Sequence, residues 1–221
     1  MTTNFAAKVH GGMGSLPHET GVAFRIWAPH ADAVFVSGTF NGWSPDSNSM
    51  VKEEEGYWYA DIPNAAIGNE YRYHIRSGDK DFLRLDPYAR QVTSSVGNAV
   101  VHDPNFDWAG DDFHIPAVNQ LVIYEMHLGT FHDKEDGKTD KFAEAVEKLD
   151  YLKRLGVNVI ELMPLAQFAG ELSWGYNPSC IFAVETNYGG AAGFKRFVKK
   201  VHEAGMGVVL DVVYNHFDQV I

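Results

Sequence analysis

An aspartate interrupts an apolar run near the C-terminal end of the sequence. Asp211 separates Val208–Leu210 from Val212–Val213, and Asn215 and His216 follow shortly after. A carboxylate buried in a strand costs several kcal/mol unless it is paired or hydrogen-bonded, and α/β barrels place active-site groups at this end of a strand. Asp211 and His216 are therefore candidate functional residues. A turn cap at Asp211 and an ordinary surface histidine at His216 are the alternatives.

The same segment offers few metal ligands. One Asp, one Asn and one His do not form a transition-metal site, and the sequence has neither a His-Glu-x-x-His motif nor a cysteine cluster. Calcium takes oxygen ligands, so Asn215 is a candidate ligand of a structural calcium ion. We expect no other cofactor.

A long connection upstream carries aromatic residues next to glycine. Residues 164–190 include Trp174-Gly175-Tyr176-Asn177, and connections of this length in compact domains are usually functional or disordered. The aromatic content argues against disorder. Trp174 and Tyr176 are candidate sugar-binding residues, because an aromatic ring can stack on the apolar C–H face of a sugar. The alternative is that they pack the loop against the core.

The elements that position these residues follow from the hydrophobic pattern of the C-terminal half. Apolar runs at 121–126, 157–163 and 207–213 predict strands, and the segments 140–155 and 191–204 predict helices. Strands separated by helices pair in parallel through right-handed crossovers, which predicts three β/α units over residues 121–221. Breakers at Asp103-Pro104 and Ile115-Pro116 predict a connector over residues 106–120.

The N-terminal half has the short alternating runs of an antiparallel β domain. Val22, Phe24 and Ile26 alternate with Ala23 and Arg25, and the pattern recurs between turn residues as far as His102. Several short strands at this spacing predict a sandwich or barrel. Its aromatic residues are candidate sugar-stacking groups, with burial in the core as the alternative.

Composition narrows the possible partners. The 221 residues carry 18 basic and 29 acidic side chains, a net charge of −11, and a single cysteine, Cys180. This charge disfavours duplex nucleic acid and anionic membranes as partners, because both attract basic surfaces. The sequence has no apolar stretch of membrane-spanning length and no secretory signal pattern at its start. We therefore expect a cytoplasmic protein that is compatible with a neutral substrate.

The N-terminal motifs resemble carbohydrate-binding module family 48. The resemblance covers about 80 residues and four ordered motifs: Phe24-Arg25-Ile26-Trp27-Ala28-Pro29, Val36 to Trp43, Gly56-Tyr57-Trp58 with Tyr71-Arg72-Tyr73, and Asp86-Pro87-Tyr88-Ala89. It implies an immunoglobulin-like β-sandwich over residues 1–105, with Trp43 and Arg72 where glycogen-binding members contact glucan. The segment 79–85 offers only Phe82 where those members use a second tryptophan. A packing role beside the next domain is the alternative.

The C-terminal motifs resemble glycoside hydrolase family 13, the α-amylase family. Four motifs occur in the family's order over about 100 residues: Tyr124 to Phe131, Glu161 to Leu165, Trp174-Gly175-Tyr176-Asn177, and Asp211-Val212-Val213-Tyr214-Asn215-His216. The resemblance implies the first three β/α units of an incomplete (β/α)8 barrel. It also implies that Asp211 and His216 hydrogen-bond the glucose at the cleavage subsite, and that Tyr176 stacks on that sugar beside Trp174. Asn215 corresponds to a calcium ligand of some members.

The family's retaining mechanism uses a nucleophile and an acid about 5–5.5 Å apart, which the family takes from strands four and five. The sequence reaches Ile221 just after the third expected strand, so we expect no catalytic carboxylate in this chain and no activity from it alone. The open edge of three barrel strands also predicts self-association, because exposed apolar edges attract partners.

Three functions fit these resemblances. The first is the N-terminal part of an enzyme that acts on an α-1,4-glucan such as glycogen, starch or maltodextrin, most like a branching enzyme. The second is a hydrolase of the α-amylase or trehalohydrolase type. The third is a noncatalytic glucan-binding or adaptor protein, suggested by the Phe40–Ser44 turn.

Overall fold

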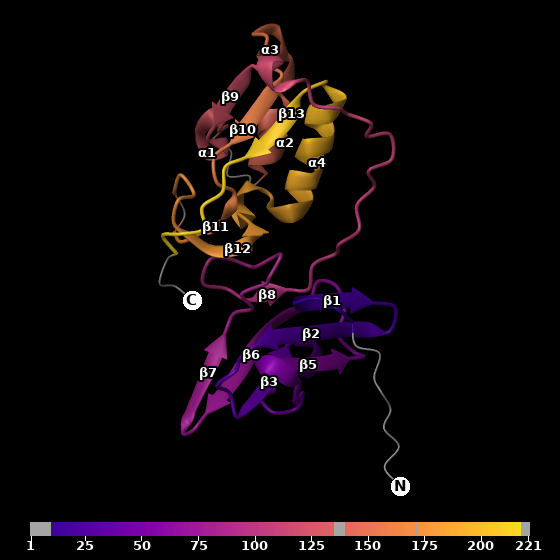
Figure 1. Cartoon of the computed structure of the whole chain (residues 1–221), viewed down its shortest axis with the longest axis vertical. Coiled ribbons are helices and arrows are strands. Elements are labelled where there is room, and N and C mark those ends of the chain that lie inside the picture. Colours follow the sequence, from indigo (N-terminus) through magenta and orange to yellow (C-terminus); the bar gives the residue numbers. More distant parts are fainter. Residues whose placement is uncertain (1–9, 135–139, 171, 218–221) are drawn as a thin grey trace. The chain divides into compact units, whose positions relative to one another are not determined.

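The computed structural model describes residues 10–134, 140–170 and 172–217. The chain divides into two compact units (Figure 1). The first comprises Met1–Ala89 with Asn98–Asp103, and the second comprises Arg90–Gly97 with Pro104–Ile221. No helix in the described residues is long and apolar enough to cross a membrane.

The first unit is a sandwich of two antiparallel sheets, which confirms the predicted fold. One sheet has the strand order β1-β2-β5-β4, and the other has β3-β6-β7 with β8 paired to β6. The strands are β1 (Gly14–His18), β2 (Gly21–Trp27), β3 (Ala33–Gly38), β4 (Val51–Lys52), β5 (Tyr57–Ile62), β6 (Glu70–Ser77), β7 (Lys80–Arg84) and β8 (Ala99–Val100). Short 3-10 turns, η1 (Thr39–Asn41) and η2 (Glu54–Gly56), lie between strands.

The alternation in β2 and β6 gives the sandwich its core. Phe24, Tyr71 and Tyr73 are fully buried, and the rings of Phe24 and Tyr71 meet edge to face at 4.9 Å. The Tyr71 hydroxyl donates to the buried Asp86 carboxylate at 2.5 Å, and the Tyr88 amide donates to its other oxygen at 2.8 Å. Burial, followed by the charge of Asp86, holds the pKa of Tyr71 well above its usual value. These aromatics are core residues and cannot contact a sugar.

The second unit is built on a parallel sheet of three strands in the order β13-β10-β9. These strands are β9 (Ile123–Met126), β10 (Val159–Leu162) and β13 (Gly207–Leu210), and the antiparallel pair β11 (Ala166–Phe168) and β12 (Pro178–Val184) lies in the long connection. The helices are α1 (Leu128–Phe131), α2 (Lys141–Val146), α3 (Leu149–Arg154) and α4 (Gly190–Glu203), with 3-10 turns η3 (Val118–Gln120) and η4 (Thr186–Tyr188). This arrangement confirms the start of a β/α barrel.

Two elements of the second unit differ from the sequence prediction by more than one or two residues at an end. The expected helix 140–155 is divided into α2 and α3, because the amides of Glu147 and Lys148 bond three residues back, to Glu144 and Ala145, and tighten the turn. The third strand ends at Leu210 instead of residue 213. Its neighbour β10 is followed by Pro164, which has no N–H to extend the ladder.

Helix α4 is amphipathic and contacts the unit on both sides. Phe194 and Phe197 each pack against Phe142 with ring centroids 5.6 Å apart. On another face, three side chains hold the segment before β9. Lys195 donates to the carbonyl of Pro104 at 3.2 Å, Lys199 to that of Asp107 at 2.9 Å, and His202 Nδ1 lies 2.8 Å from Asp111 Oδ2. Residues 104–111 are therefore fastened along α4.

Candidate functional site

The candidate site lies where β10 and β13 end. The Asp211 amide donates to the carbonyl of Leu162 at 2.9 Å, the last bond of that ladder. Asp211 is half-buried and follows the strand, so the prediction of a carboxylate inside a buried strand is wrong in that detail. Its Oδ2 accepts a hydrogen bond from the Tyr176 hydroxyl at 2.6 Å. The structure thus brings two predicted site residues, 35 positions apart, into direct contact.

A glycine permits the loop to bring Tyr176 to this position. Gly175 has φ of +91°, and a Cβ at this residue would lie 2.2 Å from the carbonyl oxygen of Pro164. Any other residue would clash with this backbone and adopt an unfavourable conformation. The close approach places Tyr176 beside the end of β10, with 38% of the residue exposed.

Three carboxylates act on the Tyr176 hydroxyl. Its pKa is raised to about 12, first by the hydrogen bond to Asp211, then by partial desolvation, and then by the charges of Asp211, Glu125 and Glu161. Glu125 and Glu161 are directly opposed on β9 and β10, so their side chains share one face of the sheet. These two glutamates were not among the residues predicted from the sequence. The sequence did contain a signal for them, because each is the single charged residue in an otherwise uncharged strand.

His127 connects the end of β9 to the Trp174 loop. Its Nε2 lies 3.0 Å from the Ser173 carbonyl oxygen and 3.2 Å from the Tyr188 hydroxyl, and its Nδ1 lies 2.8 Å from Thr130 Oγ1. An Nε2–H that donates to Ser173 leaves Nδ1 to accept from Thr130. His127 was also not predicted as a site residue, although it lies inside the motif Tyr124 to Phe131.

A cleft of about 520 Å³ opens beside this histidine. Its lining combines aromatic, polar and charged side chains: His127, Gly129, Thr130, Asp133, Lys141, Leu172, Ser173, Trp174, Asn187 and Tyr188. Trp174 is 69% exposed, and Lys141 is paired with Asp133 at 2.6 Å. The volume is in the range of small-molecule sites. At this exposure Trp174 does not pack the loop against the core, and its predicted role in stacking on a sugar remains a prediction.

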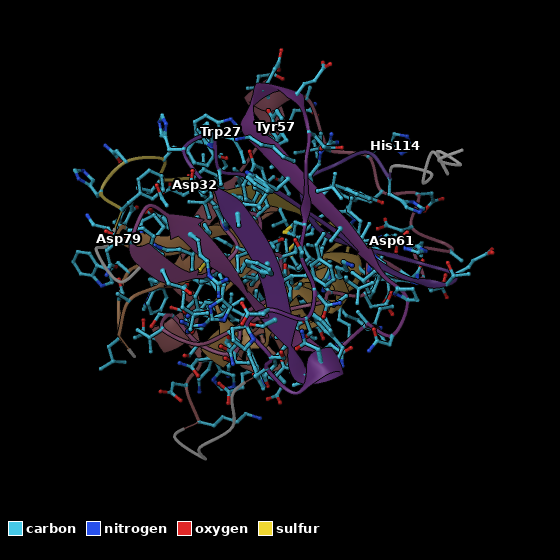
Figure 2. The ribbon with its side chains drawn as sticks, turned by 90° about the horizontal axis from the view of Figure 1, so that it is seen from below. Trp27, Asp32, Tyr57, Asp61, Asp79 and His114 are labelled. Atoms are coloured by element: carbon cyan, nitrogen blue, oxygen red, sulfur yellow. The ribbon has the colours of Figure 1, made fainter. Side chains whose placement is uncertain are left out.

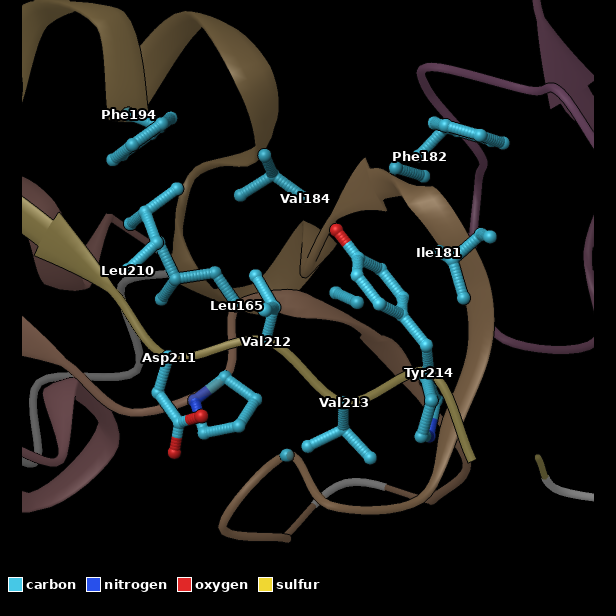
Figure 3. Close-up of a pocket in the computed structure, with 15 residues that line it drawn as sticks. Leu165, Ile181, Phe182, Val184, Phe194, Leu210, Asp211, Val212, Val213 and Tyr214 are labelled. Carbon is cyan, nitrogen blue, oxygen red and sulfur yellow. The ribbon is translucent and has the colours of Figure 1, made fainter. Parts of the chain in front are cut away.

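Figure 3 shows a second pocket, next to Asp211. It has a volume of about 120 Å³ and a mainly apolar lining that includes Leu165, Val184, Phe194 and Leu210. The Asp211 carboxylate points away from these side chains. The pocket is smaller than typical ligand sites, so we assign no binding role to it.

His216 and Asn215 follow the Tyr176–Asp211 pair in the chain, past the end of β13. Both are exposed after β13, and His216 has φ of +53°. Neither makes a hydrogen bond to Asp211 or Tyr176 in the described part of the chain. Their predicted roles, in sugar binding and calcium ligation, remain predictions.

Asparagine side chains fix the turn before Trp43 and contact Arg72 in the sandwich. Asn41 accepts from the Gly38 amide at 3.0 Å and donates to Asn48 at 2.6 Å, which fixes the turn that presents Trp43. Trp43 is 37% exposed and has φ of +63°. Arg72 Nε donates to Asn98 Oδ1 at 2.8 Å.

Comparison with protein families gives two matches. Residues 12–89 match carbohydrate-binding module 48 (isoamylase N-terminal domain), and residues 128–221 match the α-amylase catalytic domain. The chain is 36% identical over 199 residues to a malto-oligosyltrehalose trehalohydrolase of Saccharolobus solfataricus, covering 90% of the chain and 33% of that protein. It is 34% identical over 220 residues to the 1,4-alpha-glucan branching enzyme GlgB of Salinibacter ruber, covering 93% of the chain and 35% of that protein.

Solved structures of α-glucan enzymes are also similar to this chain. A type I pullulanase of Bacillus subtilis complexed with maltose has a TM-score of 0.78 at 27% identity, over 95% of this chain and 34% of that one. The group B Streptococcus pullulanase SAP in complex with maltotetraose has a TM-score of 0.76 at 28% identity, over 94% and 34%. The chain thus spans about a third of the length of the curated relatives it matches.

The Tyr176–Asp211 hydrogen bond can be tested by titration. We expect Asp211→Asn to lower the pKa of Tyr176 from about 12 toward 10, because the substitution removes a charged acceptor that favours the neutral phenol. In the native chain, the stabilisation linked to this group is complete below pH 10 and is lost as the pH rises through 12. The measurement is 13C NMR of ring-labelled tyrosine, with Tyr176→Phe to assign the signal. An unchanged pKa in Asp211→Asn would contradict the contact.

Proposed function

Because residues 12–89 are a carbohydrate-binding module 48 and residues 128–221 the first part of an α-amylase catalytic domain, we propose that the chain is the substrate-binding N-terminal third of an enzyme acting on α-1,4-glucans. The observation that carries this proposal is the Tyr176–Asp211 hydrogen bond. It places an exposed aromatic ring and a carboxylate together at the carboxyl end of parallel strands, where barrel enzymes bind substrate.

The geometry is suited to a glucose unit. The ring face of Tyr176 offers apolar contact to the C–H side of the sugar, while Asp211 accepts hydrogen bonds from its hydroxyl groups through the lone pairs that Tyr176 leaves. The exposed Trp174 provides a second aromatic surface for a neighbouring sugar in the cleft. His216 donates a further hydrogen bond to the same glucose.

The reaction proposed for the whole protein is cleavage of an α-1,4 link with retention. A carboxylate attacks the anomeric carbon while a carboxylic acid protonates the leaving oxygen, and an acceptor then takes the glycosyl group. We propose that this carboxylate pair comes from barrel strands outside residues 1–221 and that these residues alone do not catalyse the reaction. Transfer to a sugar hydroxyl, the branching reaction, is favoured by several relatives named branching enzymes at 34–35% identity.

Hydrolysis of the trehalohydrolase type is the second candidate. A specific observation favours it, since the relative that carries this name is 36% identical over 199 residues. The third candidate is a glucan-binding adaptor. Two observations support it: Asn41 fixes the turn that carries Trp43, and Trp43 is partly exposed on the sandwich.

Glucan binding by the chain can be measured with maltoheptaose. We expect Trp174→Ala and Tyr176→Ala each to weaken binding about tenfold, equivalent to about 1.4 kcal/mol, by isothermal titration calorimetry. Trp108→Ala is the matched control, because Trp108 is also exposed, at 42%, but does not line the cleft. Co-sedimentation with glycogen reports on the sandwich in the same preparations. The adaptor would be favoured if Trp43→Ala abolished glycogen co-sedimentation while Tyr176→Ala changed neither co-sedimentation nor maltoheptaose affinity.

The reaction itself needs the whole protein and amylose. We expect new α-1,6 links in the products, detected by isoamylase digestion and chain-length analysis, and Asp211→Asn should reduce their formation by at least about tenfold. Shortened linear chains or released trehalose would instead support the hydrolase. Repeating the assay with EDTA tests Asn215 as a calcium ligand, for which a loss of activity restored by calcium is expected.

We also propose that the 221-residue chain self-associates through the edge of β13. Leu210, Val212 and Tyr214 expose apolar side chains at or just beyond this strand, and edge strands with such residues attract partners. Light scattering should show a mass that rises with concentration, and Val212→Lys should lower it. A constant monomer mass across the concentration range would contradict this proposal.

A further inference from the structure

Two imidazoles and a carboxylate converge on the first unit, in residues that the proposed function does not use. His10, His18 and Asp61 each offer one ligand atom, and these atoms all lie within 4.8 Å of one another. His18 Nε2 lies 3.0 Å from Asp61 Oδ1. The rings of His10 and His18 are stacked at 4.2 Å with 10° between their planes. This is the only group of its kind among the described residues.

The strand order explains how these residues meet. His18 ends β1 and Asp61 lies near the end of β5, with β2 between them in the sheet. On β2, Gly21 is opposite His18 and Ala23 is opposite Asp61. These two small residues leave room for the imidazole and the carboxylate to reach each other across the middle strand. Figure 2 shows Asp61 toward one end of β5, with Tyr57 at the other.

The remaining nitrogen of His18 has a suitable partner. Its Nδ1 accepts from the Thr20 amide at 3.4 Å and lies 3.2 Å from the Thr20 hydroxyl oxygen, so the turn holds this side of the ring while Nε2 faces Asp61 Oδ1 at 3.0 Å. Histidine ligands of metals almost always donate their other ring N–H to a nearby acceptor, and the Thr20 hydroxyl oxygen is the acceptor available to Nδ1 once Nε2 binds an ion.

From this cluster we propose that His10, His18 and Asp61 bind one divalent transition-metal ion, with zinc as the best-suited ion. Two neutral imidazoles and one carboxylate are a zinc ligand set, and three protein ligands leave a fourth position for water. Tetrahedral bonds of about 2.0–2.1 Å place ligand atoms about 3.3 Å apart. The ligand atoms therefore need to approach by no more than about 1.5 Å from their present spacing, and one of the two stacked rings must also turn, because an ion bound by both nitrogens lies in both ring planes.

The bound ion would join three separate parts of the first unit. It connects His10, which precedes β1, to His18 at the β1–β2 turn and to Asp61 on β5. Since an ion that binds only the folded state stabilises it, zinc should raise the unfolding temperature of the sandwich. This effect does not depend on glucan binding or on catalysis, so it stands or fails separately from the proposed function.

The experiment is titration of the metal-free 221-residue chain, without any added polyhistidine sequence, with zinc chloride by calorimetry. We expect one zinc ion per chain. His18→Ala and Asp61→Asn should each weaken binding by about 100-fold or more, and Thr20→Val by about 10-fold to 100-fold. Cobalt substituted for zinc should show the intense visible absorption of a tetrahedral site, and this absorption should be lost in Asp61→Asn.

His30→Ala and Glu19→Gln are the matched controls. They remove an exposed imidazole and an exposed carboxylate of the same unit outside the cluster, and they should bind zinc like the native chain. Circular dichroism of each metal-free variant checks its folding, and Asp61→Asn preserves the shape of the side chain if His18→Ala unfolds. Failure of the native chain to bind zinc, or equal zinc affinity in the native chain and Asp61→Asn, would overturn the site.

Discussion

The candidate site depends on one close approach of two backbone segments. Gly175 passes the carbonyl of Pro164 so closely that a Cβ would lie 2.2 Å from its oxygen. Pro164 also ends the ladder that β10 offers to β13, because it lacks an N–H. The two effects coincide at the end of β10. The strands stop there, Asp211 emerges from the sheet, and the loop comes near enough for Tyr176 to donate to it at 2.6 Å.

Buried polar groups hold the rest of that loop in place. Glu185 is fully buried and accepts from Gln167 at 2.6 Å and from the Asn187 amide at 3.0 Å. Burial raises the pKa of this carboxyl, and the donating amides act in the opposite direction. Such networks specify one conformation when every member is satisfied. His127 contacts Ser173 from the other side, so the described residues of the long connection between β10 and α4 are held at both ends.

Local patterns were sufficient to predict the type and order of most elements, although not where each one ends. The alternation in β2 and β6 and the helical spacing of α4 follow from periodicity, whereas only the family resemblance implied that Asp211 and Tyr176 meet at one sugar. The charged partners of Tyr176 on β9 and β10 required the register, which sets Glu125 opposite Glu161 and which no sequence period reveals. The same holds for His18 and Asp61, which lie close together because β1 and β5 pair with the two edges of β2. Chain separations of 36 and 43 residues leave such contacts to tertiary structure.

Under the proposed function, the residues of this chain hold the sugar and do not react with it. That division agrees with the finding that relatives named for different reactions match most of this chain at almost equal identity, 36% for the trehalohydrolase and 34% for a branching enzyme. A glucose unit presents the same C–H face and hydroxyl groups to Tyr176 and Asp211, whichever acceptor later takes the glycosyl group. The choice between water and a sugar hydroxyl is made where the acceptor binds, on the other side of the scissile bond. Substitutions at the Tyr176–Asp211 pair should therefore slow every reaction of the family, while leaving the ratio of transfer to hydrolysis unchanged.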